Sequence, residues 1–503
     1  MATENVGAGI LNIITESLYD KPIVVFREYA QNSADSFNKL TQSYKGSEEE
    51  TLIHDLESHF WFDEEGDLFF LDNGKGIEPS EFRMQMETIA RSSKKKTSNI
   101  GYKGIGRLSG ISYCEKLQFI NICSLENSDY QSYSFDCLYY NKLKNSSEYN
   151  HLSFDELISK IGSFEDKSSF HDHLVINKIL ERYNHLFSKR DTGFLVIMKK
   201  INLVLERAIQ DSNFLNDISW LLPVTFKQEL LEAEKVGELF KELSTENEMN
   251  VTPAKCYNFF FNESKVERPI SLETLRSYTC KVDLTYAIGI IDFNSNQISI
   301  KKGNLFSGIR IYIDNMLLCD ENEFLPILSN LGLIDHSANE LIQSTRGIGA
   351  IIYITDKTSI STNARRTFIE VADASSIEFL TLLAEFVKKI YNARYALSKY
   401  SSFKKKIIND NEESKEKLNN LKTLAAQTLS ELAKEKIVLN EQFQTDIPFQ
   451  ELSLTEKKAT IKKFITKQIN SDIQEYLKSV TDPKDYTNSY DDYITWVSSK
   501  YHQ

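Results

Sequence analysis

The sequence lacks a long hydrophobic run. No apolar stretch reaches the roughly 18 residues that a membrane-crossing helix needs, and the N-terminal segment MATENVGAGILNII has neither the basic start nor the extended apolar core of a secretion signal. We therefore expect a cytoplasmic protein that does not enter a membrane. A chain of 503 residues with 41% hydrophobic and 26% charged residues is typical of a globular protein with roughly two to four domains.

Clusters of cysteine and histidine are also absent. None of the six cysteines forms a Cys-x-x-Cys pair, so reduced and buried thiols are expected. His171 and His173 form the only close histidine pair, and without a further ligand nearby in the sequence they are expected to be surface or core residues, not zinc ligands. The cysteines are Cys114, Cys123, Cys137, Cys256, Cys280 and Cys319.

Basic residues are outnumbered by acidic ones. The 59 Lys and Arg against 72 Asp and Glu give a net charge of −13, which argues against a surface that wraps nucleic acid as a whole. Two basic runs, at residues 94–96 and 404–406, could still contact phosphate locally. The net charge therefore does not decide whether the protein binds nucleic acid.

The segment FREYAQNSADS (residues 26–36) carries polar residues at helical spacing. Glu28, Asn32 and Asp35 stand at i, i+4 and i+7 among apolar residues, so on a helix they form one polar stripe on an otherwise apolar rod. The oxygen of Asn32 can hold Mg²⁺ while phosphate oxygens complete the shell, and the carboxylate of Glu28 can polarise an attacking water. The alternative is an ordinary amphipathic helix with a solvated polar face.

A second segment, LFFLDNGKGI (residues 68–77), ends a predicted hairpin. The runs HFWF (59–62) and DLFFLD (67–72) are rich in aromatic residues and are joined by a plausible turn. A buried carboxylate at Asp72, beside Gly74 and Gly76, can accept a hydrogen bond from an exocyclic amine while the bare backbone lets a flat base lie close. Asp-Asn-Gly is also common in simple turns, which is the alternative.

The third segment, IGYKGIGRLSG (residues 100–110), is rich in glycine and precedes a predicted helix over 108–117. Backbone amides around Gly101, Gly104 and Gly106 can surround phosphate, and Lys103 and Arg107 add positive charge. The spacing is neither that of a Walker loop nor that of a Rossmann fingerprint. Residues 88–99 are polar and basic and would cover a bound nucleotide, or form a plain solvated loop. The three segments together predict one site for a Mg-nucleotide.

With these residues in view, the chain resembles the GHKL ATPases, which include gyrase B subunits, heat-shock ninety chaperones, sensor histidine kinases, MutL and MORC proteins. SLYDKPIVVFREYAQNSADS, METIARSSK and GYKGIGR are most similar to the chaperone and MORC branch. The resemblance implies a Bergerat α/β sandwich that binds ATP and Mg²⁺, with Glu28 as the base, Asn32 as the Mg²⁺ ligand and Asp72 as the adenine reader. Arg107 departs from the pattern, because the chaperones usually carry an aromatic residue there. The other residues expected to contact the nucleotide are Asp35, Gly74, Gly76, Ile77, Ser92, Ser93, Lys94, Gly101, Tyr102, Lys103, Gly104, Ile105, Gly106 and Arg107.

The expected fold class is α+β, in three parts. Residues 1–202 would form the nucleotide domain, with strands over 116–123, 132–140 and 192–201 and an irregular stretch over 141–172. Residues 203–374 contain strand-like runs such as 218–226 and 257–264 and resemble the mixed α/β transducer domain of the gyrase, MutL and chaperone branches. Residues 375–503 are expected to be all helical and to serve dimerisation or partner binding.

A basic residue from the second part would complete the site. In STNARRTFIE (residues 361–370) the resemblance makes Arg366 the candidate that senses the γ-phosphate, with Arg365 second. A cation held on another domain can neutralise charge on the transferred phosphoryl group only when the domains close. Lys301 and Lys302 could do the same, and a solvated Arg-Arg pair beside Glu370 is the alternative.

These features predict an ATP-hydrolysing conformational switch. ATP would order the cover over the site and, by the resemblance, join two protomers as a nucleotide-dependent homodimer. The switch would act on a nucleic-acid or protein client or a partner effector subunit, and a bacterial antiviral defence system is a setting in which short relatives occur.

Other functions are less favoured. One alternative is a nucleotide-binding, chaperone-like scaffold with negligible turnover. A kinase of the histidine-kinase type is another, although such kinases place a phospho-acceptor helix before the nucleotide domain. A topoisomerase or mismatch endonuclease is disfavoured because no acidic metal-binding module or Cys/His cluster follows the second part.

Overall fold

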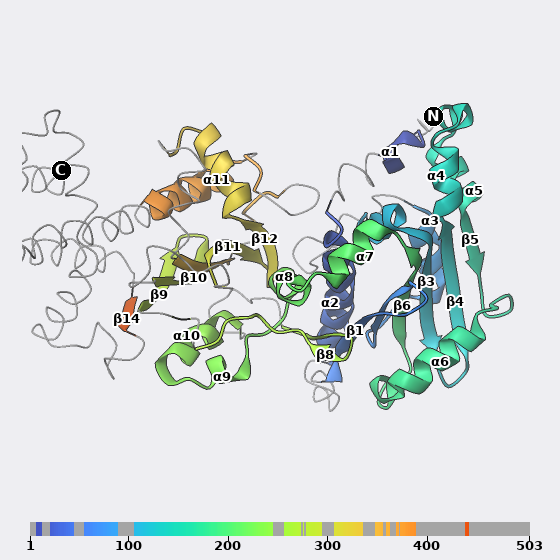
Figure 1. The fold of residues 1–503 in the computed structure, drawn as a ribbon, viewed down its shortest axis with the longest axis horizontal. Helices are drawn as coiled ribbons and strands as arrows, with labels where there is room; N and C mark the ends of the chain where they lie inside the picture. The colour runs from blue at the N-terminus through green and yellow to red at the C-terminus, as the bar shows by residue number, and fades with distance from the viewer. Residues whose placement is uncertain are drawn as a thin grey trace, which may run out of the picture. The chain divides into compact units, whose positions relative to one another are not determined.

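The computed structural model describes residues 7–12, 21–44, 55–88, 105–244, 256–272, 275, 278–293, 306–334, 348–355, 359–362, 369–371, 373–388 and 438–441. The chain divides into two compact units, and each is described by itself (Figure 1). The first comprises Met1–Thr225, Ala254–Arg268 and Asp314–Met316, and the second Phe226–Pro253, Pro269–Ile313 and Leu317–Gln503.

An eight-stranded sheet forms the centre of the first unit. In chain order its strands are β1 (Glu57–Phe62), β2 (Leu68–Asp72), β3 (Cys114–Ser124), β4 (Asp129–Asp136), β5 (Gly162–Glu165), β6 (Gly193–Ile201), β7 (Asn258–Phe261) and β8 (Ser264–Lys265). Their order across the sheet is β5-β4-β3-β6-β2-β1-β7-β8. The antiparallel pairing of β1 with β2 confirms the predicted hairpin. Strand β6 pairs with both β2 and β3, a central position that suits its continuous apolar sequence.

Helices cover both faces of this sheet. They are α1 (Gly9–Asn12), α2 (Val24–Tyr44), α3 (Pro79–Glu87), α4 (Cys137–Leu143), α5 (Phe154–Ile161), α6 (His173–Tyr183), α7 (Leu203–Gln210) and α8 (Phe214–Leu221), with 3-10 helices η3 (Gly106–Tyr113), η4 (Ser147–His151) and η5 (Asn184–Phe187). Side chains alternate along β1. Phe60 packs against Phe26 of α2, whereas Trp61 stacks on Phe69 and contacts Tyr183 of α6. Helices α2 and α6 therefore lie on opposite faces.

Several local predictions for this unit differ from the structure. The helix predicted over 108–117 is a 3-10 helix that ends at Tyr113, because sheet pairing with β6 already begins at Cys114. The strand predicted over 132–140 ends at Asp136, whose side chain accepts a hydrogen bond from the Tyr139 amide at 2.7 Å and so caps α4. The stretch 141–172, expected to be irregular, contains α5 with a complete capping box at its start.

Two runs assigned to the second part by sequence also behave differently. Residues 218–226 were predicted as a strand, but α8 extends to Leu221 and buries Phe214 and Ile218 on one side. A spacing of four residues is typical of a helix. It is not evident in the sequence, because the neighbouring residues in this run are apolar as well. Residues 257–264 contribute β7, which pairs in parallel with β1 in the sheet of the first unit.

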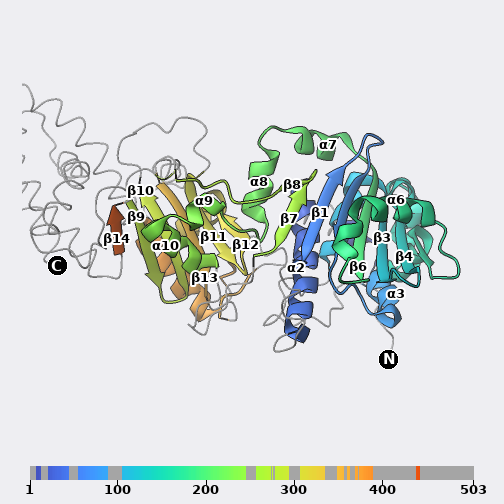
Figure 2. The ribbon, with the colours of Figure 1, turned by 90° about the horizontal axis from the view of Figure 1, so that it is seen from below.

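A six-stranded sheet forms the centre of the second unit. Its strands are β9 (Tyr278–Leu284), β10 (Ala287–Phe293), β11 (Gly308–Ile313), β12 (Met316–Asp320), β13 (Ile348–Ile354) and β14 (Val438–Glu441). They lie in the order β12-β11-β13-β10-β9-β14 (Figure 2). Helices α10 (Glu234–Ser244) and α11 (Glu321–Asn330) lie on opposite sides of this sheet (Figure 1), while α9 (Gln228–Leu231) precedes α10. The mixed α and β composition agrees with the expected class.

The part from residue 375 onward was expected to be all helical. Residues 374–388 are helical, and Phe379 and Leu383 pack in the core of the second unit. Residues Val438–Glu441, in contrast, form β14, which pairs antiparallel with β9. Hydrogen bonding to the edge of the sheet explains the strand, since an edge leaves backbone groups free to pair. Within the described residues, no helix is both long enough and apolar enough to cross a membrane.

Candidate functional site

Helix α2 carries the first motif through the core of the first unit. Its apolar side chains, such as Phe26 and Phe37, belong to that core. Glu28 and Asp35 are buried too, with 6% and 1% of their surface exposed, while Asn32 is partly exposed. Burial of carboxylates is costly unless polar groups or a cation surround them. The polar stripe of α2 is therefore not a solvated face.

The loop of the third motif reaches α2 at Glu28. A Cβ atom added to Gly106 would collide with Oε2 of Glu28, so a larger residue at this position would displace that carboxylate. The hydroxyl of Tyr29 donates to the carbonyl of Arg107 at 3.2 Å. The guanidinium of Arg107 in turn donates to the carbonyl of Thr88, at the C-terminal end of α3. These contacts hold the start of η3 against α2 and α3.

The second motif places Asp72 at the end of β2. Its carboxylate is 5% exposed. Oδ1 accepts from the Gly74 amide and Oδ2 accepts from the Ser33 hydroxyl, both at 2.9 Å. Burial raises the pKa of Asp72 to about 6, although the hydrogen bonds from Gly74 and Ser33 act to lower it. Asp72 is thus a buried acceptor in a site that penalises its charge.

The loop after Asp72 is held by two residues that sequence reasoning did not select. The Asn121 side chain accepts from the Ile77 amide at 2.9 Å and donates to the Ile77 carbonyl at 2.7 Å. Gly76 has φ 69°, and a Cβ there would come within 2.8 Å of Asn121 Oδ1. The Thr192 hydroxyl donates to the Gly74 carbonyl at 3.1 Å. Both residues lie in or beside strands, where the sequence carries no signal for such a role.

Gly74 brings this loop onto α2 as well. A Cβ atom at Gly74 would collide with Oγ of Ser36. That hydroxyl is buried and has no hydrogen-bond partner among the described residues. Glu28 and Ser36 stand about 12 Å apart along the helix axis, at 1.5 Å per residue. Gly106 and Gly74 therefore approach the same helix at two separated points, and an elongated ligand that touches both would lie along α2.

Two further predicted site residues, Ile77 and Ile105, lie in the second and third motifs. Ile105 and Ile77 are partly exposed at the start of η3 and in the loop after Asp72. The following predicted residues lie outside the described part of the chain: Ser92, Ser93, Lys94, Gly101, Tyr102, Lys103, Gly104 and Arg366, with its alternatives Arg365, Lys301 and Lys302.

The described residues fit ATP with Mg²⁺. The buried carboxylate of Asp72 matches the exocyclic amine of adenine, and the unpartnered Ser36 hydroxyl lies in the same region. Asn32 and Glu28 offer the hard oxygen atoms that Mg²⁺ prefers, one helical turn apart on α2. The backbone at Gly106 stands beside Glu28, and backbone amides in such a position can donate to phosphate oxygens.

Comparison with known proteins supports this assignment for part of the chain. A search of curated proteins finds no match. Residues 53–168 match the family model described as histidine kinase-, DNA gyrase B- and HSP90-like ATPase. The match includes Asp72, Gly74 and Gly106, while Glu28 and Asn32 precede it. This part of the chain is therefore similar to ATPase domains of the GHKL type, and that similarity suggests ATP binding.

Proposed function

We propose that the first unit binds and hydrolyses ATP with Mg²⁺. The observation that carries the proposal is the approach of two separate segments to α2, which brings Gly106 to Glu28 and Asp72 to Ser33. Adenine would lie at Asp72 and the phosphates at the glycine loop. The buried polar groups Glu28 and Ser33 on α2 thus face other motifs, which an amphipathic surface helix would not need.

The residues of the proposed site share the chemical tasks as follows. Ionised Asp72 accepts the hydrogen bond from the adenine amine, and Asn121 and Thr192 keep its loop in place. Glu28 takes a proton from the attacking water as a general base. The amide of Gly106 can donate to a phosphate oxygen. Asn32 would hold Mg²⁺, which supplies positive charge to the phosphates when bound.

Substitution of Glu28 tests the proposed reaction. Glu28→Gln removes the base but keeps size and polarity, so ATP should still bind while kcat falls by roughly 100-fold or more. Asp72→Asn should lower the affinity for ATP by roughly 10- to 100-fold, because a hydrogen bond to a charged acceptor contributes about 1.5–3 kcal/mol. Phosphate release and direct nucleotide binding measure the two effects. Turnover by Glu28→Gln at the parental rate would show that the assigned base is wrong.

We also propose, from the resemblance to the chaperone and MORC branch, that ATP joins two protomers and that hydrolysis releases them. A cation from residues 361–370, with Arg366 first, would complete the site on closure. The client would be a nucleic acid or a protein. Solution mass with and without a non-hydrolysable ATP analogue tests the dimer, and phosphate release with and without DNA tests the client. A scaffold with negligible turnover would bind ATP yet release no phosphate in either condition.

A further inference from the structure

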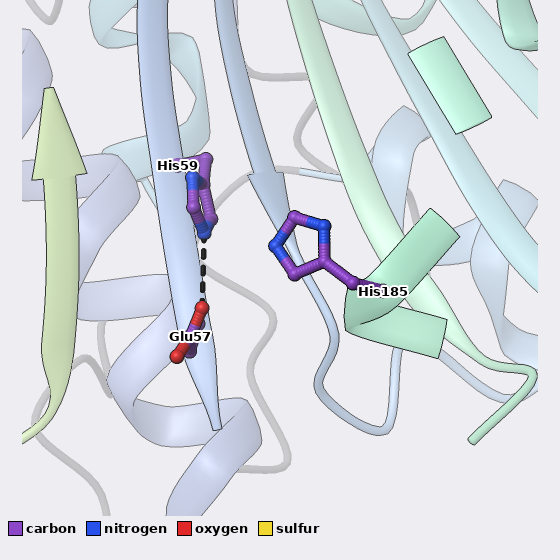
Figure 3. Close-up of side chains that lie close together, drawn as sticks. All are labelled: Glu57, His59 and His185. Carbon is purple, nitrogen blue, oxygen red and sulfur yellow. Dashed lines mark hydrogen bonds and ion pairs between the residues drawn. The ribbon is translucent and has the colours of Figure 1, made fainter. Parts of the chain in front are cut away.

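Three side chains with metal-ligating atoms meet on the first unit, outside the site described above. Glu57 and His59 come from β1, and His185 comes from η5 (Figure 3). One donor atom from each lies within 4.8 Å of the others. The sequence did not reveal this group, because η5 follows β1 only after several intervening elements and no spacing signals the contact.

The group lies on the face of the sheet opposite α2. Glu57 and His59 alternate along β1 with Ser58, whose hydroxyl is 3.3 Å from that of Ser33 on α2. His59 is instead close to Tyr183 of α6, with ring centroids 4.9 Å apart. The group is therefore separated from the proposed nucleotide site by the sheet itself.

His59 is held in one orientation. Its ring stacks on Phe260 of β7, with centroids 4.6 Å apart and an angle of 9°, and the residue is 6% exposed. Its Nε2 lies 3.1 Å from Oε2 of Glu57. The His185 ring stands nearly perpendicular to that of His59, at 80° and 6.0 Å between centroids, and is exposed. The group thus combines one buried imidazole, one partly buried carboxylate and one imidazole open to solvent.

Asn73 connects the two elements that carry these side chains. It is fully buried. Its Oδ1 accepts from the Glu57 amide at 2.9 Å, and its Nδ2 donates to the carbonyl of Leu186 at 3.0 Å. Leu186 directly follows His185, so a single amide side chain fixes β1 and η5 relative to each other. The backbone positions of the three side chains are therefore set before any ligand binds.

We propose that Glu57, His59 and His185 bind a divalent transition-metal ion of the zinc class. Two imidazoles and one carboxylate are a known ligand set for Zn²⁺, and imidazole favours Zn²⁺, Co²⁺ and Ni²⁺ over Mg²⁺. Tetrahedral ligands at about 2.1 Å from zinc stand about 3.4 Å apart. The donor atoms of the three side chains, which lie within 4.8 Å of one another, must therefore move closer together to bind the ion. His185 can supply that movement because its side chain is exposed. Solvent would fill the fourth position, and the ion would join η5 to β1.

Metal titration of the full chain tests the proposal. After treatment with a chelator, Co²⁺ should produce the visible absorption of a four-coordinate nitrogen and oxygen site, and Zn²⁺ should displace it in buffer containing excess Mg²⁺. At a hundredfold excess over Kd, Zn²⁺ should raise the Tm by roughly 5 °C. His185→Gln should weaken Zn²⁺ binding at least tenfold and so reduce the rise in Tm at the same Zn²⁺ concentration to about half or less. His171→Gln, which removes another exposed histidine, should leave both unchanged.

Two outcomes would overturn the proposal. One is the absence of a Co²⁺ spectrum and of a Zn²⁺-dependent change in Tm for the parent protein. The other is equal loss of binding in His185→Gln and His171→Gln, which would indicate adventitious binding by surface histidines. Since the group lies across the sheet from α2, His185→Gln should bind ATP as the parent does, and that measurement also shows that the variant is folded.

Discussion

Asp72→Asn should stabilise the protein in the absence of nucleotide. The side chain is buried, and the pKa of Asp72 is about 6 against an ordinary 3.8. That difference corresponds to about 3 kcal/mol. Because the folded-state pKa is the higher one, the ionised carboxylate penalises folding fully above pH 6 and not at all below 3.8. Asparagine carries no charge, and its amide can keep partners at Gly74 and Ser33.

Urea unfolding measures this effect. At pH 7.5 the variant should gain up to about 3 kcal/mol, and at pH 5 only about 1.6 kcal/mol, since part of the penalty has then been relieved by protonation of the parent. Trp61 and Trp220, both in the first unit, report its unfolding by fluorescence. Asp155→Asn, an exposed change on α5, serves as the control and should alter stability by less than about 0.5 kcal/mol.

The same variant should lose most of its affinity for ATP, so stability and binding should move in opposite directions. A less stable Asp72→Asn protein at pH 7.5 would refute the reasoning from burial. So would a gain in stability that is the same at pH 5 and pH 7.5. The first result would mean that contacts of the carboxylate outweigh the cost of removing it from water, and the second that the gain does not come from its ionisation.

Two further substitutions examine the neighbouring contacts. Gly106→Ala places a Cβ against Glu28 and should reduce ATP turnover at least tenfold, while Gly9→Ala, which has open space around it, should not; equal activity of both variants would contradict the close approach. Ser33→Ala removes a hydrogen bond that lowers the pKa of Asp72, so its loss of ATP affinity relative to the parent should be greater at pH 6.5 than at pH 8.5. Because variant and parent are compared at the same pH, the titration of ATP itself does not affect the ratio of their affinities. An equal loss of affinity at both pH values would argue against ionised Asp72 as the acceptor.

Much of the local structure follows from the sequence because it depends on neighbouring residues. The apolar spacing of α2 and the aromatic runs of β1 and β2 predict the helix and the hairpin that the structure contains. Predictions failed where tertiary pairing decided the outcome, as at Cys114, where the sheet ends a predicted helix. An apolar run such as residues 218–226 suits a buried helix as well as a strand, and only packing selects between them.

The roles of individual side chains divide in the same way. Residue types alone indicated Glu28, Asn32 and Asp72, since a nucleotide with Mg²⁺ needs a base, a hard oxygen ligand and an amine acceptor. The i, i+4 spacing placed Glu28 and Asn32 on one side of α2, whereas the approach of Asp72 and Gly106 to that helix could be expected only from the resemblance. Asn121, in β3, and Thr192, directly before β6, hold the Asp72 loop from positions whose sequence gives no sign of that role.

The sequence by itself determined the chemistry available to this protein, because helix periodicity, strand alternation and glycine placement act over a few residues. Only the tertiary structure decided which distant side chains meet. Burial raises the pKa of Asp72, and the packing of η5 beside β1 brought His185 to Glu57 and His59. Such contacts depend on how strands pair and helices pack, and the free energy of that packing is a property of the whole fold and not of any single segment.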